Sequence, residues 1–249
     1  MKQPQALSKE FLLGALRREG GDFRDAVAKS ELSALVPPCP EWTVQRLVNH
    51  MAGLYEWVCQ IIELGGEKPA RREAQQRGDD VLAWFDEALA TALSTLDKTD
   101  PDAPAWNWST QPDVAAFWPR RMAHETAVHR WDAQMVSGLA SPIDHELAAD
   151  GVSEVLDTFL PAGRAAVTHD AEGLVRLTAT DLGQTWLVRL RESGPTLLDE
   201  DTIFDESPEP QTRVAGGASD LVLALWGRVP VSVLAVEGDP ARFERLRTA

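Results

Sequence analysis

Apolar residues recur every three to four positions along the first 140 residues, which is the period of helices that bury one face. The second of these segments has the clearest ends, because Thr43 is a suitable N-cap and Gly65 should terminate the helix. Four helices are expected, over about residues 7–28, 44–64, 79–96 and 114–136, with 119 as an alternative start for the last. Helices of this length joined by loops predict a four-helix bundle.

The pattern changes after Gly138 and mixes helical with strand-like segments. We expect a helix over about 145–159, followed by two strands that flank a turn at Leu182–Gly183. The rest of the chain should form, in order, a strand TRVAGGA, a helix SDLVLALWGR capped by Ser219, a strand VSVLAVEGD and a helix PARFERLRT. The domain boundary is expected near Ser141–Pro142. The sequence therefore predicts a protein of mixed fold class, with a helical bundle over 1–140 followed by a smaller α+β domain over 141–249.

Charge and composition narrow the classes of partner. The chain has 24 basic and 39 acidic residues, a formal net charge of −15, without the clustered Lys and Arg that phosphate binding needs, so nucleic acid is excluded. No run of 18 apolar residues and no signal-peptide pattern occurs, so we expect a cytoplasmic protein without a membrane partner. Cys39 and Cys59 form no CxxC pair, which argues against a disulfide framework or a cysteine zinc site.

The segment RMAHETAVHRWDAQ, residues 121–134, places two histidines and a glutamate within six residues. His124 and His129 are five apart, about 140° around a helix, so they cannot bind one ion from this helix as the histidines of HExxH do. Glu125 and His129 are four apart and share a face. That pair suits zinc or a related divalent ion, but a third ligand must come from elsewhere, and His124 is assigned to packing or the surface.

His50 is the natural third ligand, since it falls on the apolar stripe of the second helix and bundles gather metal ligands from facing helices. The alternative for His50 alone is a histidine satisfied within the core. The alternative for Glu125 is a salt bridge with Arg121, four residues earlier. Asp132 returns to the face of His129, either as an acceptor for an imidazole N–H or in a salt bridge or helix-end contact.

Four segments together resemble the mycothiol-dependent maleylpyruvate isomerase family: CPEWTVQRLVNHMAGLYEW, RRMAHETAVHRWDAQ, ASDLVLALWGR and VEGDP. The resemblance covers nearly the whole chain. It implies a DinB-like metal-binding bundle followed by a sterol-carrier-like α+β domain. The metal histidine of the family falls on His50, and its Glu-x-x-x-His pair falls on Glu125 and His129.

Two histidines and one carboxylate leave coordination positions open, which is typical of a catalytic ion, most often zinc. The resemblance implies that mycothiol is the thiol cosubstrate and that its zinc-bound thiolate attacks an electrophilic small molecule, as a cis–trans isomerase or a thiol S-transferase. The same ion could instead activate water in a hydrolase. A non-enzymatic ligand-binding or sensor protein is the third hypothesis. We expect a monomer or homodimer whose partner is a small-molecule electrophile.

Arg228 is the candidate catalytic residue of the second domain. It follows Trp226 and Gly227 at a predicted helix end, and an anionic substrate approaching a protein of charge −15 needs local positive charge. A guanidinium on such a turn can bind a carboxylate in a bidentate manner. The alternative is that Arg228 satisfies the last carbonyls of its own helix.

Overall fold

The computed structural model describes residues 6–69, 80–166, 171–198 and 209–248. The described residues divide into two compact units, one within Leu7–Ser141 and the other within Pro142–Ala249. Within the described residues, no helix has the length and apolar character needed to cross a membrane. Each unit is described by itself below.

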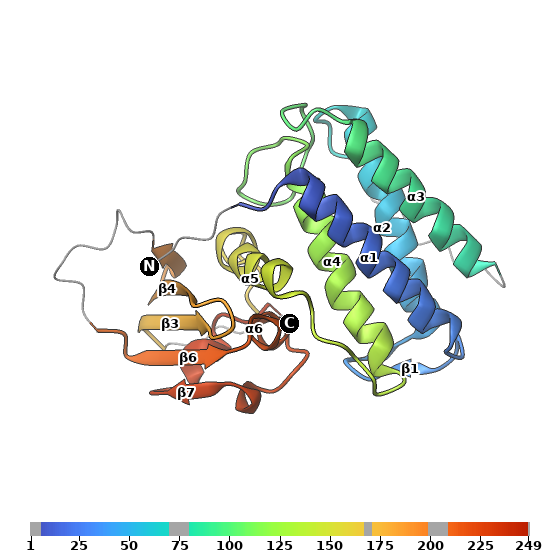
Figure 1. Cartoon of the computed structure of the whole chain (residues 1–249). Helices are drawn as coiled ribbons and strands as arrows, with labels where there is room; N and C mark the ends of the chain where they lie inside the picture. The colour runs from blue at the N-terminus through green and yellow to red at the C-terminus, as the bar shows by residue number, and fades with distance from the viewer. Residues whose placement is uncertain (1–5, 70–79, 167–170, 199–208, 249) are drawn as a thin grey trace. The chain divides into compact units, whose positions relative to one another are not determined.

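The first unit is a bundle of helices in its described part (Figure 1). Helix α1 packs mainly against α4, and α2 packs mainly against α3, while α1 meets α3 and α2 meets α4 along narrower seams. The bounds are α1 Lys9–Ala28, α2 Val44–Leu64, α3 Val81–Lys98 and α4 Phe117–Met135. All four predicted helices are therefore confirmed, with ends within a few residues of the expected ones.

Helix α2 begins and ends where local chemistry predicts. The hydroxyl of Thr43 accepts a hydrogen bond from the backbone N–H of Arg46 at 3.2 Å. Gly65 has φ +59°, a left-handed conformation that glycine adopts without strain, and it terminates the helix. The chain enters α2 from a short antiparallel hairpin of β1, Leu35–Val36, and β2, Cys39–Thr43.

Two polar contacts fix the helices of the bundle relative to one another. The hydroxyl groups of Tyr55 on α2 and Thr126 on α4 lie 2.7 Å apart in the buried interior. One turn further along α4, the guanidinium of Arg130 donates to the carboxylate of Glu19 on α1 at 2.7 Å, and both groups are almost fully buried. Because a buried polar group without its partner is costly, each pair favours a single helix register.

The second unit combines helices with a five-stranded mixed sheet of order β5-β4-β3-β6-β7. Strands β3 and β6 run parallel, and the other neighbouring strands run antiparallel. The strands are β3 Gly173–Ala179, β4 Gln184–Arg191, β5 Gly194–Leu198, β6 Thr212–Gly216 and β7 Ala235–Glu237. The helices are α5 His145–Glu154, which continues as a π-helical turn over Val155–Phe159, α6 Ala218–Leu225 and α7 Ala241–Glu244. This arrangement confirms the predicted α+β class.

Three details of the second unit differ from the prediction. Ser219 does not cap α6: Gly217 occupies the cap position, and the Ser219 hydroxyl accepts from the backbone N–H of Ile143 at 3.0 Å. The segment expected as one long strand is a 3-10 turn over Val231–Val233 followed by the short strand β7. Strand β5 was not expected, because five residues beginning Gly-Pro carry little strand signal.

Candidate metal centre

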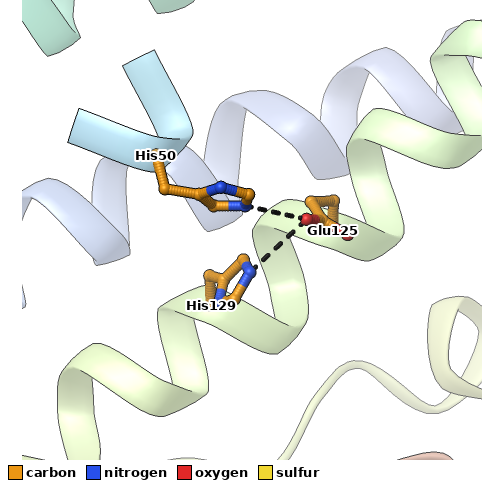
Figure 2. A group of neighbouring side chains, drawn as sticks. All are labelled: His50, Glu125 and His129. Carbon is orange, nitrogen blue, oxygen red and sulfur yellow. Dashed lines mark hydrogen bonds and ion pairs between the residues drawn. The ribbon is translucent and has the colours of Figure 1, made fainter. Parts of the chain in front are cut away.

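The three side chains singled out in the sequence converge at the seam between α2 and α4 (Figure 2). Glu125 Oε1 lies 3.1 Å from His50 Nε2 and 3.4 Å from His129 Nε2. One ligand atom from each residue lies within 4.8 Å of the others, so a single ion can contact all three. The pair on α4 is brought together by its i, i+4 spacing, and His50 is supplied by the facing helix.

The position of His50 opposite α4 depends on how the two helices are locked. Tyr55 lies just over one turn beyond His50, and its partner Thr126 is the residue after Glu125. Thr126 in turn donates to the backbone carbonyl of Met122, also at 2.7 Å. This buried chain of hydrogen bonds therefore sets the helix register close to the place where the three ligand atoms meet.

The two carboxylate oxygens of Glu125 contact different partners. Oε2 accepts from Arg121 Nη2 at 2.7 Å, while Oε1 faces the two histidines. Burial alone would raise the pKa of Glu125, but the Arg121 charge and the hydrogen bonds from His129 and His50 outweigh it and hold that pKa well below its ordinary value. The salt bridge considered as an alternative thus coexists with the cluster, and Glu125 is an anion at neutral pH.

His129 is oriented from behind by Asp132, a fully buried carboxylate. His129 Nδ1 donates to Asp132 Oδ2 at 2.9 Å, which leaves Nε2 facing Glu125, and the Cys39 thiol donates to the same oxygen at 3.7 Å. Burial by itself lowers the pKa of His129, but its bonds to Asp132 and Glu125 raise it to about 9. Asp132 thus acts as the imidazole acceptor, and the same contact is a salt bridge when His129 is protonated, so both roles considered for Asp132 meet in one contact.

His50 departs from the prediction, because its side chain is 33% exposed and is not part of the core. Val48, Ala52 and Tyr55 of α2 are fully buried although they lie off the stripe that contains His50, so the buried face is rotated relative to the stripe assumed from the sequence. An apolar pattern containing large residues on several faces does not fix the rotation of a helix to within one residue. The consequence is that the cluster reaches solvent at His50 while His129 lies inside.

Two residues at the rim of the cluster were not anticipated. The Trp42 ring stacks on that of His129, with centroids 6.0 Å apart and an interplanar angle of 19°, and meets the His50 ring edge-on at 5.0 Å. The guanidinium carbon of Arg46 lies 5.0 Å from the Trp42 centroid. A signal existed in the sequence, since Arg46 precedes His50 by one turn on the same face of α2.

The remaining candidates are not among the three ligand residues. His124 is buried and outside the cluster, as its direction on α4 predicts. Arg228 belongs to the other unit and follows Gly227, which has φ +68°. Its Nη1 donates to the carbonyl of Trp226 at 2.9 Å, which is the helix-end contact considered as the alternative to substrate binding. Within the part of the chain that the structure describes, neither Cys39 nor Cys59 forms a disulfide.

Two family models together match most of the chain. Residues 13–134 match the family model described as "Mycothiol maleylpyruvate isomerase N-terminal domain", and residues 146–245 match "MDMPI C-terminal domain". The crystal structure of the mycothiol-dependent maleylpyruvate isomerase is similar, with a TM-score of 0.65, 14% identity, and coverage of 95% of this chain and 96% of that chain. A histidine-to-alanine mutant of that isomerase matches with a TM-score of 0.64 at the same identity and coverage.

A comparison with curated proteins found no match. At 14% identity, the two crystal structures show a common fold and leave substrate and mechanism open. The family matches extend over most of both units. The chain therefore belongs to the mycothiol maleylpyruvate isomerase family.

Proposed function

We propose that this protein is a metal-dependent enzyme that uses a thiol cosubstrate, mycothiol, to isomerise or conjugate an electrophilic small molecule. The observation that carries the proposal is the convergence of His50, Glu125 and His129 from two helices in a chain of this family. Two imidazole nitrogens and one carboxylate oxygen leave further coordination positions open to reactants. Zinc is the proposed ion because this mixed donor set suits it.

The separations of the donor atoms fit a small divalent ion. Ligands about 2.0–2.1 Å from a tetrahedral zinc lie about 3.3 Å from one another. The 3.1 Å and 3.4 Å separations from Glu125 Oε1 to the two histidines are close to that value. A divalent ion held here would lower the pKa of a thiol or water placed beside it.

The side chains around the three ligands orient the atoms that would bind the ion. Arg121 keeps Glu125 ionised and fixes its Oε2, so that Oε1 is the oxygen presented to the ion. Asp132 accepts a hydrogen bond from His129 Nδ1–H and thereby keeps Nε2 directed towards Glu125 Oε1. Because Arg121 and Asp132 are almost fully buried, water competes weakly for these contacts.

The chemistry proposed for the substrate needs only addition and expulsion of the thiol. The sulfur adds to one carbon of an activated C=C bond, and the electron pair moves onto the activating carbonyl. Rotation about the resulting single bond, followed by expulsion of the sulfur, gives the trans alkene and returns the thiol. If the adduct takes up a proton and keeps the sulfur, the same first step gives an S-conjugate. Maleylpyruvate, which the name of the similar isomerase specifies, is the first substrate to test.

Arg228 is proposed to bind an anionic group of the substrate. Its place on the Gly227 turn and the net charge of −15 support that role. The hydrogen bond from Arg228 to the Trp226 carbonyl supports the alternative, in which the side chain only caps α6. The two roles differ in what the loss of the guanidinium does to turnover, and that difference provides the test.

The experiment is metal analysis of the purified protein, followed by assay of maleylpyruvate with and without mycothiol. We expect about one divalent ion per chain and turnover that requires the thiol. His129→Ala serves as the metal-deficient control. Turnover by the metal-loaded protein without thiol would overturn the proposal in favour of a water-using hydrolase. A folded wild-type protein that binds no divalent ion would overturn it in favour of a ligand-binding protein.

A further inference from the structure

Arginine residues gather on one face of the five-stranded sheet in the second unit, where β4, β3 and β6 lie side by side (Figure 1). Residues paired across neighbouring strands point to the same face of a sheet, and so do alternate residues along one strand. Arg176 on β3 is paired with Arg213 on the parallel strand β6. Leu187 of β4 is opposite Arg176, so Arg189, two residues further along β4, is a diagonal neighbour of Arg176. We call this side of the sheet, with Arg176, Arg189 and Arg213, the arginine face.

The arginine face reaches solvent, whereas the opposite face of the sheet is core. The buried side chains of the opposite face include Val175, Leu177, Trp186, Val188 and Val214. On the arginine face Arg213 is exposed, and Arg176 and Arg189 are half-buried. Leu174 and Leu187 alternate with the arginines and are buried, as is common for apolar residues beside long arginine stems. A ligand from solution can therefore reach this face.

The positive charges of the arginine face are only partly neutralised. Arg213 pairs with Glu209 at 2.7 Å, and Glu237 on β7 is opposite Arg213. Within the described residues, neither Arg176 nor Arg189 forms an ion pair with a carboxylate. Arg176 is moreover directly opposite Arg213, and like charges in that position destabilise a sheet. Fold stability thus does not account for the arginine at position 176.

Two buried polar atoms on the arginine face have no hydrogen-bond partner in the described part of the chain, Arg176 Nε and Thr185 Oγ1. Thr185 is paired with Thr178 and is the second diagonal neighbour of Arg176 on β4. Because a buried donor without an acceptor is costly, such atoms indicate a missing ligand. The N–H of Arg176 and the hydroxyl of Thr185 can both donate to one anion bound over Arg176.

The surroundings favour a small anion with more than one charge. A phosphate monoester carries a charge of about −2 and three acceptor oxygens, which match several guanidinium groups better than the single charge of a carboxylate does. Glu209 and Glu237 border the arginine face, and the net charge of the protein is −15. An extended polyanion, such as nucleic acid or an anionic membrane, would meet these acidic groups as well, whereas a single phosphate group would not.

We propose that the arginine face binds the phosphate monoester group of a small soluble molecule. Arg176, Arg189 and Thr185 donate to the phosphate oxygens, and Arg213 adds positive charge beside them. The site lies in the second unit, whereas the three metal ligands lie in the first. It is therefore a second binding site that does not depend on the proposed function of the metal centre.

The test is calorimetric titration of the full chain with methyl phosphate at constant ionic strength. Dimethyl phosphate, a diester with one charge like the diesters of lipids and nucleic acids, and acetate are titrated for comparison. Arg176→Gln and Arg189→Gln each remove one guanidinium from the site. The matched control is Arg24→Gln, which changes the net charge equally in the first unit, where Arg24 pairs with Asp86 at 3.4 Å. His129→Ala is included to separate the site from the metal centre.

We expect one methyl phosphate per chain, bound at least about tenfold more weakly by Arg176→Gln and by Arg189→Gln, because each loses charge-assisted hydrogen bonds. Arg24→Gln and His129→Ala should bind it as wild type does, and dimethyl phosphate and acetate should bind more weakly than methyl phosphate. Without ligand, Arg176→Gln should unfold in denaturant at the same or a higher concentration than wild type, because it removes a like charge opposite Arg213.

Three kinds of result would overturn the inference. The first is wild-type protein that binds no methyl phosphate, or that binds it no more tightly than the two arginine variants do. The second is loss of binding in His129→Ala, which would place the anion at the metal centre. The third is equal affinity for dimethyl phosphate, or cosedimentation with phosphatidylglycerol vesicles that Arg176→Gln abolishes, which would assign the arginine face to a membrane surface.

Discussion

Metal affinity should rise steeply with pH, because His129 must lose a proton before its Nε2 can bind an ion. Without metal, the bonds to Asp132 and Glu125 outweigh burial and raise the pKa of His129 to about 9. At pH 7 the imidazole is therefore protonated, and an incoming ion must displace that proton. The perturbation is simply the pH of the binding buffer.

The size of the effect follows from the distance between the pH and this pKa. From pH 7 to pH 9 the affinity should increase about tenfold per pH unit, or about a hundredfold in all, and then level off. The metal-free fold responds in the opposite direction. A folded-state pKa of about 9, against an ordinary 6.5, contributes about 3 kcal/mol of stability that is fully present below pH 6.5 and lost as pH rises through 9.

The assay is competition for zinc against a chromophoric chelator between pH 6.5 and 9.5, with calorimetry at pH 7 in two buffers of different ionisation enthalpy. We expect release of at least one proton per ion. Asp132→Asn removes a charge that raises the pKa of His129, so its affinity should level off at a lower pH. A wild-type affinity that changes less than threefold over the range, with no proton released, would refute the reasoning.

The other predictions concern single substitutions. His129→Ala should abolish zinc binding and turnover together, whereas His124→Ala should leave both unchanged. Elemental analysis measures the bound zinc and the thiol-dependent assay measures turnover. The reverse pattern would contradict the choice of His129 over His124 as the metal ligand on α4. Tyr55→Phe removes the 2.7 Å contact to Thr126 and should lower the free energy of unfolding by about 1 kcal/mol while zinc stoichiometry stays at one, as denaturant titration and metal analysis will show. Arg228→Ala should retain metal and fold but reduce turnover at least about tenfold, or roughly 1.4 kcal/mol; unchanged kinetics would leave only the capping contact to Trp226.

The features that the sequence predicted correctly are those decided by local chemistry. Thr43 and Gly65 delimit α2 because a hydroxyl cap and a left-handed glycine act within one turn of the chain. The pairing of Glu125 with His129 follows from helix geometry alone. His50 was inferred from the apolar stripe of the second helix and from the architecture of a bundle, and the family resemblance supported it, because no spacing rule connects residues 75 positions apart.

The features that the sequence did not predict depend on packing between distant segments. The exposure of His50 is set by the rotation of α2 against its neighbours, and the stacking of Trp42 on His129 joins β2 to α4. Serine is a residue type that often caps helices, but the Ser219 hydroxyl accepts a hydrogen bond from the backbone N–H of Ile143 instead. In each case a local preference was outweighed by a tertiary contact that no pattern in one sequence reveals.

The central claim is an open divalent site built from His50, Glu125 and His129, and X-ray absorption of the zinc-loaded protein tests it most directly. Before thiol is added, we predict two imidazole ligands and oxygen donors at about 2.0–2.1 Å, with no sulfur. Addition of mycothiol should introduce one sulfur at about 2.3 Å while both imidazoles remain. A spectrum without imidazole scattering, or with sulfur present before the thiol, would contradict the site, and a spectrum that mycothiol leaves unchanged would contradict its use of a thiol.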